Sequence, residues 1–169
     1  GELTRALAPL REQLEQLSDD VHTLAYRLHP SLLEHAGLRP AVEEHVHQVS
    51  RRTGLPIHLK ILDVPDAVPL DQATCLFRVM QESVQNVVKH AQATTVTVQL
   101  RGSSKGVGLS VIDNGKGFDS QDLGIHQQGL GLSSMEERLR QLHGFFRIQS
   151  RPSHGTKVCA WVPCKVEVA

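Results

Sequence analysis

The spacing of hydrophobic residues is helical at the start of the chain and changes further along. From Leu3 to Leu28 the apolar positions step alternately by four and three residues, with polar residues between them. This is the heptad pattern of a coiled coil or helix bundle, whose narrow apolar stripe is best buried against another helix. We expect this helix to dimerise with a second copy of the chain; a helical hairpin within one chain is the alternative.

The pattern then changes twice. A second helix is expected from Pro40 to about Arg52, because proline is favoured in the first helical turn and Gly54 stands just beyond the last one. Residues 57–62 alternate between apolar and polar types, and this period of two predicts a strand.

Two further helices are predicted by the same reasoning. The apolar residues at 76–91 return at intervals of three and four, so a helix is expected there, with Asp71 as its N-cap. Ser133 and Ser134 are each followed three residues later by a glutamate, which predicts capping boxes at the start of a helix over 133–143.

The remaining segments are rich in β-branched residues. Cys159 and Trp161 alternate onto one face of the last of them, and we expect both in the core. The order of helices and strands predicts an α+β fold, a two-layer α/β sandwich in which helices cover one face of a mixed or largely antiparallel sheet. The additional strands are expected at 95–100, 107–113, 145–150 and 156–163.

Composition narrows the classes of function. Eighteen basic and eighteen acidic residues leave no net charge and only 4% of residues are aromatic, so we expect no nucleic-acid partner. Three cysteines without a C-x-x-C pair fit a reducing compartment, and no apolar run approaches the roughly 20 residues that span a bilayer. We expect a cytoplasmic location, which includes the cytoplasmic part of a membrane-anchored protein.

The helix over 76–91 carries a carboxylate and a carboxamide on one face. Glu82 and Asn86 are four residues apart and therefore project toward the same spot. Asn86 offers the kind of neutral oxygen that Mg²⁺ accepts when phosphates complete its shell. Lys89, one turn further on, can reach the same phosphates, and Glu82 can take a proton. Taken singly, each residue also fits an ordinary solvated helix face.

Two glycine-bearing loops complete the candidate site. Asp113 directly follows a strand, where a fixed carboxylate can accept a hydrogen bond from an exocyclic amine, and Gly115 and Gly117 would let a flat ring approach the backbone. An ordinary turn is the alternative. Gly129 and Gly131 precede the helix expected at 133 and leave N–H groups free for phosphate oxygens. No P-loop or protein-kinase motif is present.

The order of these motifs resembles one protein family. They are QESVQNVVKHA at 81–91, DNGKGF at 113–118, GLGLSSMEER at 129–138 and the pair Gly155-Thr156. Over about residues 70–163 they resemble the N box, the two glycine boxes and the final G-T pair of the ATP-binding domain of sensor histidine kinases. Their sequences are most similar to those of the subfamily whose response regulators carry helix-turn-helix output domains of the nitrate-response type. Residues 28–46 also resemble that subfamily.

The resemblance implies the Bergerat-type ATP-binding fold shared with gyrase- and Hsp90-type ATPases, with ATP and Mg²⁺ as cofactors. Asp113 would bind the adenine amino group, and Thr156 would back it. Glu82 would be the catalytic base that prepares the acceptor imidazole for transfer of the γ-phosphoryl group. Asn86 would hold Mg²⁺, and the remaining cofactor-binding residues would be Lys89, His90, Gly115, Gly117, Gly129 and Gly131.

The resemblance also implies partners and a division of the chain. Residues 1–36 would be the C-terminal part of the dimerisation bundle and residues 37–169 the catalytic domain, with a cognate response regulator receiving the phosphoryl group. None of the ten histidines is followed by the acidic residue that marks the family's phosphoacceptor, so we expect the first bundle helix to lie outside this chain. Alternatives are a related ATPase or serine kinase, and a nucleotide-binding or dimerising pseudokinase that would have lost Glu82, Asn86 or Asp113.

Overall fold

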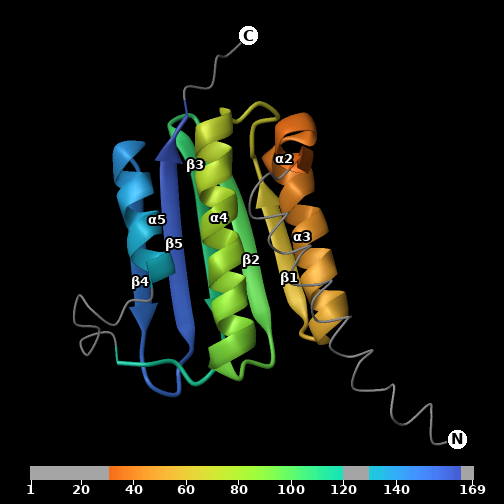
Figure 1. Cartoon of the computed structure of the whole chain (residues 1–169), viewed down its shortest axis with the longest axis vertical. Coiled ribbons are helices and arrows are strands. Elements are labelled where there is room, and N and C mark those ends of the chain that lie inside the picture. The colour runs from red at the N-terminus through yellow and green to blue at the C-terminus, as the bar shows by residue number, and fades with distance from the viewer. Residues whose placement is uncertain (1–30, 120–129, 165–169) are drawn as a thin grey trace, which may run out of the picture.

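The computed structural model describes residues 31–119 and 130–164. Its centre is a five-stranded sheet in the order β1-β2-β3-β5-β4. β1 pairs with β2 in parallel and the other neighbours are antiparallel, so the sheet is mixed as predicted (Figure 1). The strands are β1 Ile57–Leu62, β2 Val96–Ser103, β3 Gly106–Asp113, β4 Phe145–Ser150 and β5 Thr156–Pro163.

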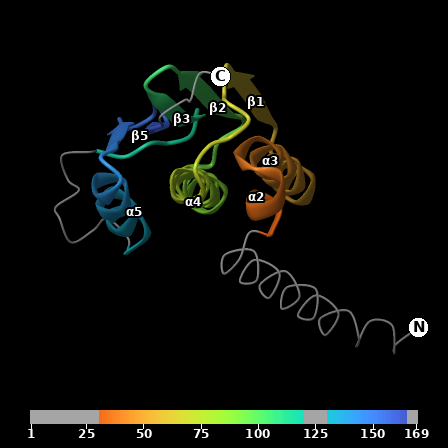
Figure 2. The ribbon, with the colours of Figure 1, turned by 90° about the horizontal axis from the view of Figure 1, so that it is seen from above.

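The described helices all lie on one face of this sheet, which confirms the two-layer arrangement (Figure 2). α4 crosses the middle of the sheet, α5 lies over β4 and β5, and α3 lies over β1 (Figure 1). The bundle helix expected over residues 3–28 lies outside the described residues. The helices are α2 Ser31–Ala36, α3 Leu38–Thr53, α4 Leu70–Asn86, the π-helical turn η1 Val87–Ala91, and α5 Leu130–Gln141.

The core forms between α4 and the covered face of the sheet. Phe77 and Met80 of α4 are fully buried, and so are the alternate residues Val96, Val98 and Leu100 of β2. A helical period of three to four residues on α4 thus meets a strand period of two on β2, and each presents one apolar side to the other. This packing fixes α4 over the strands that position the candidate site.

α2 also contributes to the core. Leu33 is only 2% exposed, and α2 packs against both α3 and α4. The division of the chain at residues 36 and 37 remains a prediction. With that division, this short helix belongs to the first part and packs against α3 and α4 of the second.

The opposite face of the sheet is not covered by any described segment (Figure 2). Cys159 and Trp161 lie on this open face, because the buried residues of β5 are Val158, Ala160 and Val162. The expectation that Cys159 and Trp161 are core residues was therefore wrong. Alternation predicts two faces but does not say which of them is buried.

Trp161 is accommodated on the open face by a neighbouring glycine. A Cβ atom on Gly106 would overlap its indole ring, so the ring lies close against the backbone of β3. Phe145 of β4 stacks on the same indole, with ring centroids 6.2 Å apart and an interplanar angle of 17°.

Three predicted helix starts were wrong, while one predicted end was correct. α3 begins at Leu38, so Pro40 is the third residue of that helix and not the first. α4 begins at Leu70 after Pro69, so Asp71 lies in the first turn, where its charge favours the helix dipole, and makes no cap bond. α5 begins at Leu130, which places Ser133 and Ser134 inside the helix instead of at its cap. Gly54 ends α3 in the left-handed conformation, with its N–H bonded to Ser50 O at 2.9 Å.

Candidate functional site

The helix that carries the first motif changes its winding within that motif. α4 is α-helical to Asn86, and η1 then forms a single π-helical turn that ends before Gln92, a residue with a φ of 54°. The wider turn changes which side chains face the sheet. Val87 is buried, whereas Val88, expected on the apolar face, is 39% exposed. Single π-turns inside helices occur frequently at functional sites.

The predicted polar residues divide between the α-helical part and the π-helical turn. Glu82 and Asn86 are both half-buried, on neighbouring turns of one face of α4. Lys89 and His90 lie on η1 and are exposed. The structure therefore keeps the carboxylate and the carboxamide partly shielded and leaves the two basic side chains in solvent.

Asp113 is the most buried carboxylate of the described residues, with 6% of its surface exposed. It is the last residue of β3, and it lies at the end of the sheet where the α4–η1 helix also ends (Figure 1). Its Oδ1 accepts a hydrogen bond from the backbone N–H of Gly115 at 2.8 Å. Among the described residues, Oδ2 has no hydrogen-bond partner and can accept one from a ligand.

The loop after Asp113 packs directly against η1. Lys116 N donates to Ala91 O at 2.7 Å, and a Cβ atom on Gly115 would overlap that same carbonyl. Glycine is required at this point because the two backbones touch. The motif around Asp113 and the end of the motif around Asn86 are thereby joined.

The turn between β4 and β5 packs against the loop from its other side. Gly155 has a φ of +72°, and a Cβ atom there would overlap the carbonyl oxygen of Asp113. Gly117 has a φ of +57° and lies against the carbonyl of Arg151. The final glycine of the sequence pattern thus holds the backbone of the candidate adenine-binding residue.

Thr156 lies beside this contact, and its hydroxyl is bonded to a residue that the sequence reasoning missed. Ser150 Oγ lies 2.9 Å from Thr156 Oγ1, accepts from Phe118 N at 3.0 Å and donates to Gly155 O at 3.0 Å. Ser150 is 7% exposed and is one of three buried polar residues among those described. Its only signal in the sequence was a polar residue at the end of a strand.

Asn114 was also missed, because only Asp113 and the glycines of the D-N-G-x-G pattern were given roles. Its Oδ1 accepts from Thr94 N at 2.9 Å and from Thr95 N at 3.1 Å, and its Nδ2 donates to Thr94 Oγ1 at 2.8 Å. These partners lie about 20 residues earlier in the chain, between η1 and β2.

The second glycine motif is described only in part. Gly131 lies in the first turn of α5, and Gly129 lies outside the described residues. The expectation that both glycines precede the helix was therefore wrong for Gly131, because α5 starts earlier than its serines suggested. α5 itself packs along α4, which carries Glu82 and Asn86.

The donor set allows a magnesium ion only with help from a ligand. In residues 31–119 and 130–164, no group of three or more His, Cys, Asp or Glu side chains is arranged to hold a metal ion. Asn86 could supply one oxygen, and a nucleotide's phosphates would have to supply further ligands. This fits Mg²⁺, which binds through few protein oxygens plus phosphates and water.

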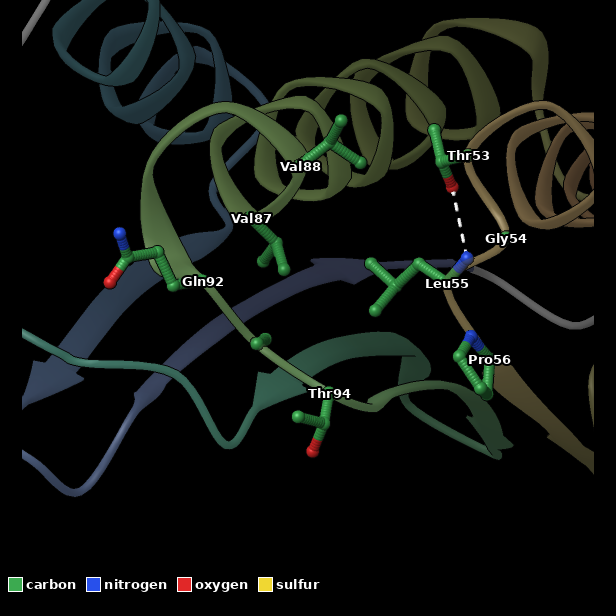
Figure 3. A pocket seen from close by; sticks show the side chains of 9 residues that line it. Thr53, Gly54, Leu55, Pro56, Val87, Val88, Gln92 and Thr94 are labelled. Atoms are coloured by element: carbon green, nitrogen blue, oxygen red, sulfur yellow. Dashed lines mark hydrogen bonds between the residues drawn. The ribbon is translucent and has the colours of Figure 1, made fainter.

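A shallow groove of about 330 Å³ lies on the side of η1 that faces α3 (Figure 3). Its lining comes from the end of α3, the segment between α3 and β1, η1 itself and the segment between η1 and β2, including Thr53, Leu55, Val88 and Thr94. It contains none of the predicted site residues, so we do not assign it to the nucleotide. Within the described part of the chain, no helix is both long enough and apolar enough to cross a membrane.

Comparison with known proteins gives the class of this fold and site. Residues 71–166 match the family described as histidine kinase-, DNA gyrase B- and HSP90-like ATPase. The match covers more than half of the chain, so this protein belongs to that ATPase family, as the four motifs suggested. The matched region contains α4 with Glu82 and Asn86 and the loop with Asp113.

The curated relatives are sensor histidine kinases. The chain is 32% identical over 154 residues to the nitrate/nitrite sensor protein NarX of Escherichia coli, covering 88% of the chain and 25% of the relative. It is 36% identical over 155 residues to the histidine-protein kinase/phosphatase UhpB of Salmonella typhimurium, covering 89% and 30%. It is 29% identical over 166 residues to DegS of Brevibacillus brevis, covering 98% and 42%. The chain thus spans less than half of each of these relatives.

Solved structures support the fold. A blue-light activated histidine kinase of Erythrobacter litoralis aligns with a TM-score of 0.63 at 19% identity, over 96% of this chain and 62% of that one. The histidine kinase AdeS of Acinetobacter baumannii aligns with a TM-score of 0.59 at 20% identity, over 95% and 84%. At these identities the likeness shows a shared fold.

Proposed function

We propose that this chain is the catalytic ATP-binding part of a sensor histidine kinase and transfers the γ-phosphoryl group of ATP to a histidine for relay to a response regulator. The observation that carries the proposal is the buried carboxylate of Asp113. One of its oxygens is held by Gly115 N–H, and the other is available to a ligand. A fixed acceptor at a glycine-lined edge suits an exocyclic amine such as that of adenine.

The other predicted residues would surround a nucleotide whose base is bound by Asp113. Gly115 and Gly117 would shape the base pocket, with Thr156 behind it. Lys89 and His90 would approach the nucleotide from η1, and Gly129 and Gly131 would flank the phosphates. Asn86 would hold Mg²⁺, which when bound neutralises phosphate charge.

Glu82 would act as the base in the transfer step. The acceptor imidazole nitrogen forms a bond to the γ-phosphorus, the bond from that phosphorus to the β-phosphate oxygen breaks, and ADP leaves. The imidazole proton passes to the Glu82 carboxylate. Because such transfers need little covalent help from the protein, the residues act mainly by positioning and by balancing charge.

The wider setting is part of the same proposal. We place the protein in the cytoplasm, with residues 1–36 as the end of a dimerisation bundle and residues 37–169 as the catalytic domain. A second copy of the chain would pair through the N-terminal helix, and the cognate response regulator would receive the phosphoryl group.

Calorimetric titration with a non-hydrolysable ATP analogue tests the nucleotide site. Asp113→Ala should weaken binding by about 10- to 100-fold, since a hydrogen bond to a charged acceptor contributes about 1.5–3 kcal/mol. Asp66→Ala, which removes an exposed carboxylate outside the site, should bind like the wild type. Asn86→Ala should bind equally with and without Mg²⁺. A folded wild type that binds no analogue would refute the proposal, and preserved Mg²⁺ dependence in Asn86→Ala would remove Asn86 from the metal role.

A further inference from the structure

The side chain of Asn114 continues the pairing of β2 with β3 beyond the end of the strands. Val96 and Asp113 are the last paired residues at this end of the ladder. The Asn114 side chain then bonds the two preceding N–H groups, of Thr94 and Thr95, and the Thr94 hydroxyl. Both lone-pair sites of its oxygen and one of its two N–H donors are in use.

The segment that Asn114 holds leads directly from η1. Thr94 is three residues beyond Ala91, whose carbonyl accepts from Lys116 N. The loop after Asp113 is therefore tied at two points, by residue 116 to the end of η1 and by residue 114 to the segment that follows η1. Gly115 lies between these two points, and its N–H is the group that orients the Asp113 carboxylate.

We propose that Asn114 is a positioning residue that allows Asp113 to select a 6-amino purine over a 6-oxo purine. This role rests on the proposed function of Asp113. An amino group donates to the carboxylate, whereas an oxo group would present its lone pairs to the same oxygen. The difference is large only if the carboxylate cannot turn away, and a site built around a fixed polar group discriminates strongly against the analogue that leaves it unpaired.

The exposure of Asn114 separates this role from a general contribution to folding. The side chain is exposed, and its hydrogen bonds compete with water. Such bonds contribute modestly to stability, so removing them leaves a folded protein with a looser loop. The loop that loosens is the one that holds Gly115 N–H against Asp113.

The experiment compares the affinities of ATP and of inosine triphosphate, which carries a 6-oxo group, using the full chain and calorimetry. Asn114→Ala should lower the ATP preference about three- to tenfold, the effect of losing one or two modest hydrogen bonds. Asn114→Asp keeps an acceptor for both N–H groups and should retain the wild-type preference. Its repulsion of the triphosphate is common to both nucleotides and cancels in the ratio. Gln48→Ala, which removes another exposed hydrogen-bonded carboxamide, should change nothing.

Each result has a defined meaning. A reduced preference in Asn114→Ala, restored in Asn114→Asp, with thermal stability within a few degrees of wild type, supports the positioning role. An unchanged preference, or equal losses of affinity for both nucleotides, overturns this inference alone. A wild type that binds neither nucleotide, or binds both equally, refutes the proposed function of Asp113 and the role of Asn114 with it.

Discussion

Gly155→Ala tests whether the turn between β4 and β5 fixes the backbone of Asp113. Gly155 has a φ of +72°, and an added Cβ atom would overlap the carbonyl oxygen of Asp113. Gly54 at the end of α3 has nearly the same φ, +69°, but an added Cβ atom there would meet nothing within 4 Å. Both substitutions therefore introduce the same backbone strain, and only Gly155→Ala adds a steric overlap.

The magnitudes follow from that difference. A residue with a Cβ in the left-handed region costs about 1–2 kcal/mol, so Gly54→Ala should lower the free energy of unfolding by about that amount. Overlap in a packed region adds about 1–3 kcal/mol or more. Gly155→Ala should therefore cost about 2–5 kcal/mol in total. For a chain of this size, each kcal/mol lowers the melting temperature by about 2–4 °C.

Urea denaturation of the wild type and both variants measures these costs, and titration with an ATP analogue measures the effect on the site. Gly155→Ala should also weaken nucleotide binding, because the carbonyl it displaces belongs to Asp113, whereas Gly54→Ala should not. If the two variants are destabilised equally and bind nucleotide equally, the Asp113 backbone relaxes freely. The argument that Gly155 constrains the site would then be wrong.

Two further predictions concern stability. Ser150→Ala should cost about 2–4 kcal/mol in urea denaturation, because it removes three hydrogen bonds and leaves the carbonyl of the buried Gly155 unpaired. Ser110→Ala, on the open face, is the control, and a loss below about 1 kcal/mol at Ser150 would contradict the assignment. Burial and, secondly, the nearby charge of Arg52 lower the pKa of His45 from 6.5 to about 4. The unfolded chain therefore binds the proton first, so stability should fall as pH drops from about 6.5 toward 4, by up to about 3 kcal/mol. His45→Gln should flatten this dependence in pH-dependent melting curves, and a slope that persists in His45→Gln would refute the assignment.

The parts of the fold that depend on periodicity were predictable. The limits of β4 and β5 agree with the predicted 145–150 and 156–163, and α4 has the expected buried side. Periodicity could not show which face of a strand is buried. Cys159 and Trp161 share a face, but which face is buried depends on where the helices pack (Figure 2). Gly106, in a strand about 55 residues earlier, leaves room for the indole on the open face.

The winding of the first motif was not predictable either. Val88 fits an α-helical apolar pattern, but it lies on the π-turn and is 39% exposed. No local preference of the residues predicts the extra residue of a π-turn. We attribute the π-turn to tertiary packing at the end of the helix. Here Ala91 O bonds Lys116 N instead of continuing the helix.

The missed site residues share one property, which is that each has a hydrogen-bond partner distant in sequence. Ser150 bonds the N–H of Phe118, 32 residues away, and Asn114 bonds Thr94, 20 residues away. A motif search weighs residues by type and local spacing. A serine that closes a strand and an asparagine in a turn both have ordinary local explanations, so nothing distinguished them before the fold brought their partners together.

The glycines of the motifs are explained by packing, whereas Asp113 is not. Gly115 lies against Ala91 O and Gly155 against Asp113 O, so the packing of the chain against itself requires both, whether or not a nucleotide binds. A pseudokinase that kept this fold would have to keep those glycines too. The carboxyl group of Asp113 is only 6% exposed, and one of its two oxygens is bonded. Burying a carboxyl group without a full set of partners is unfavourable, so its position has no such structural explanation among the described residues. The argument for nucleotide binding therefore rests on Asp113, and the glycines explain how that residue is held.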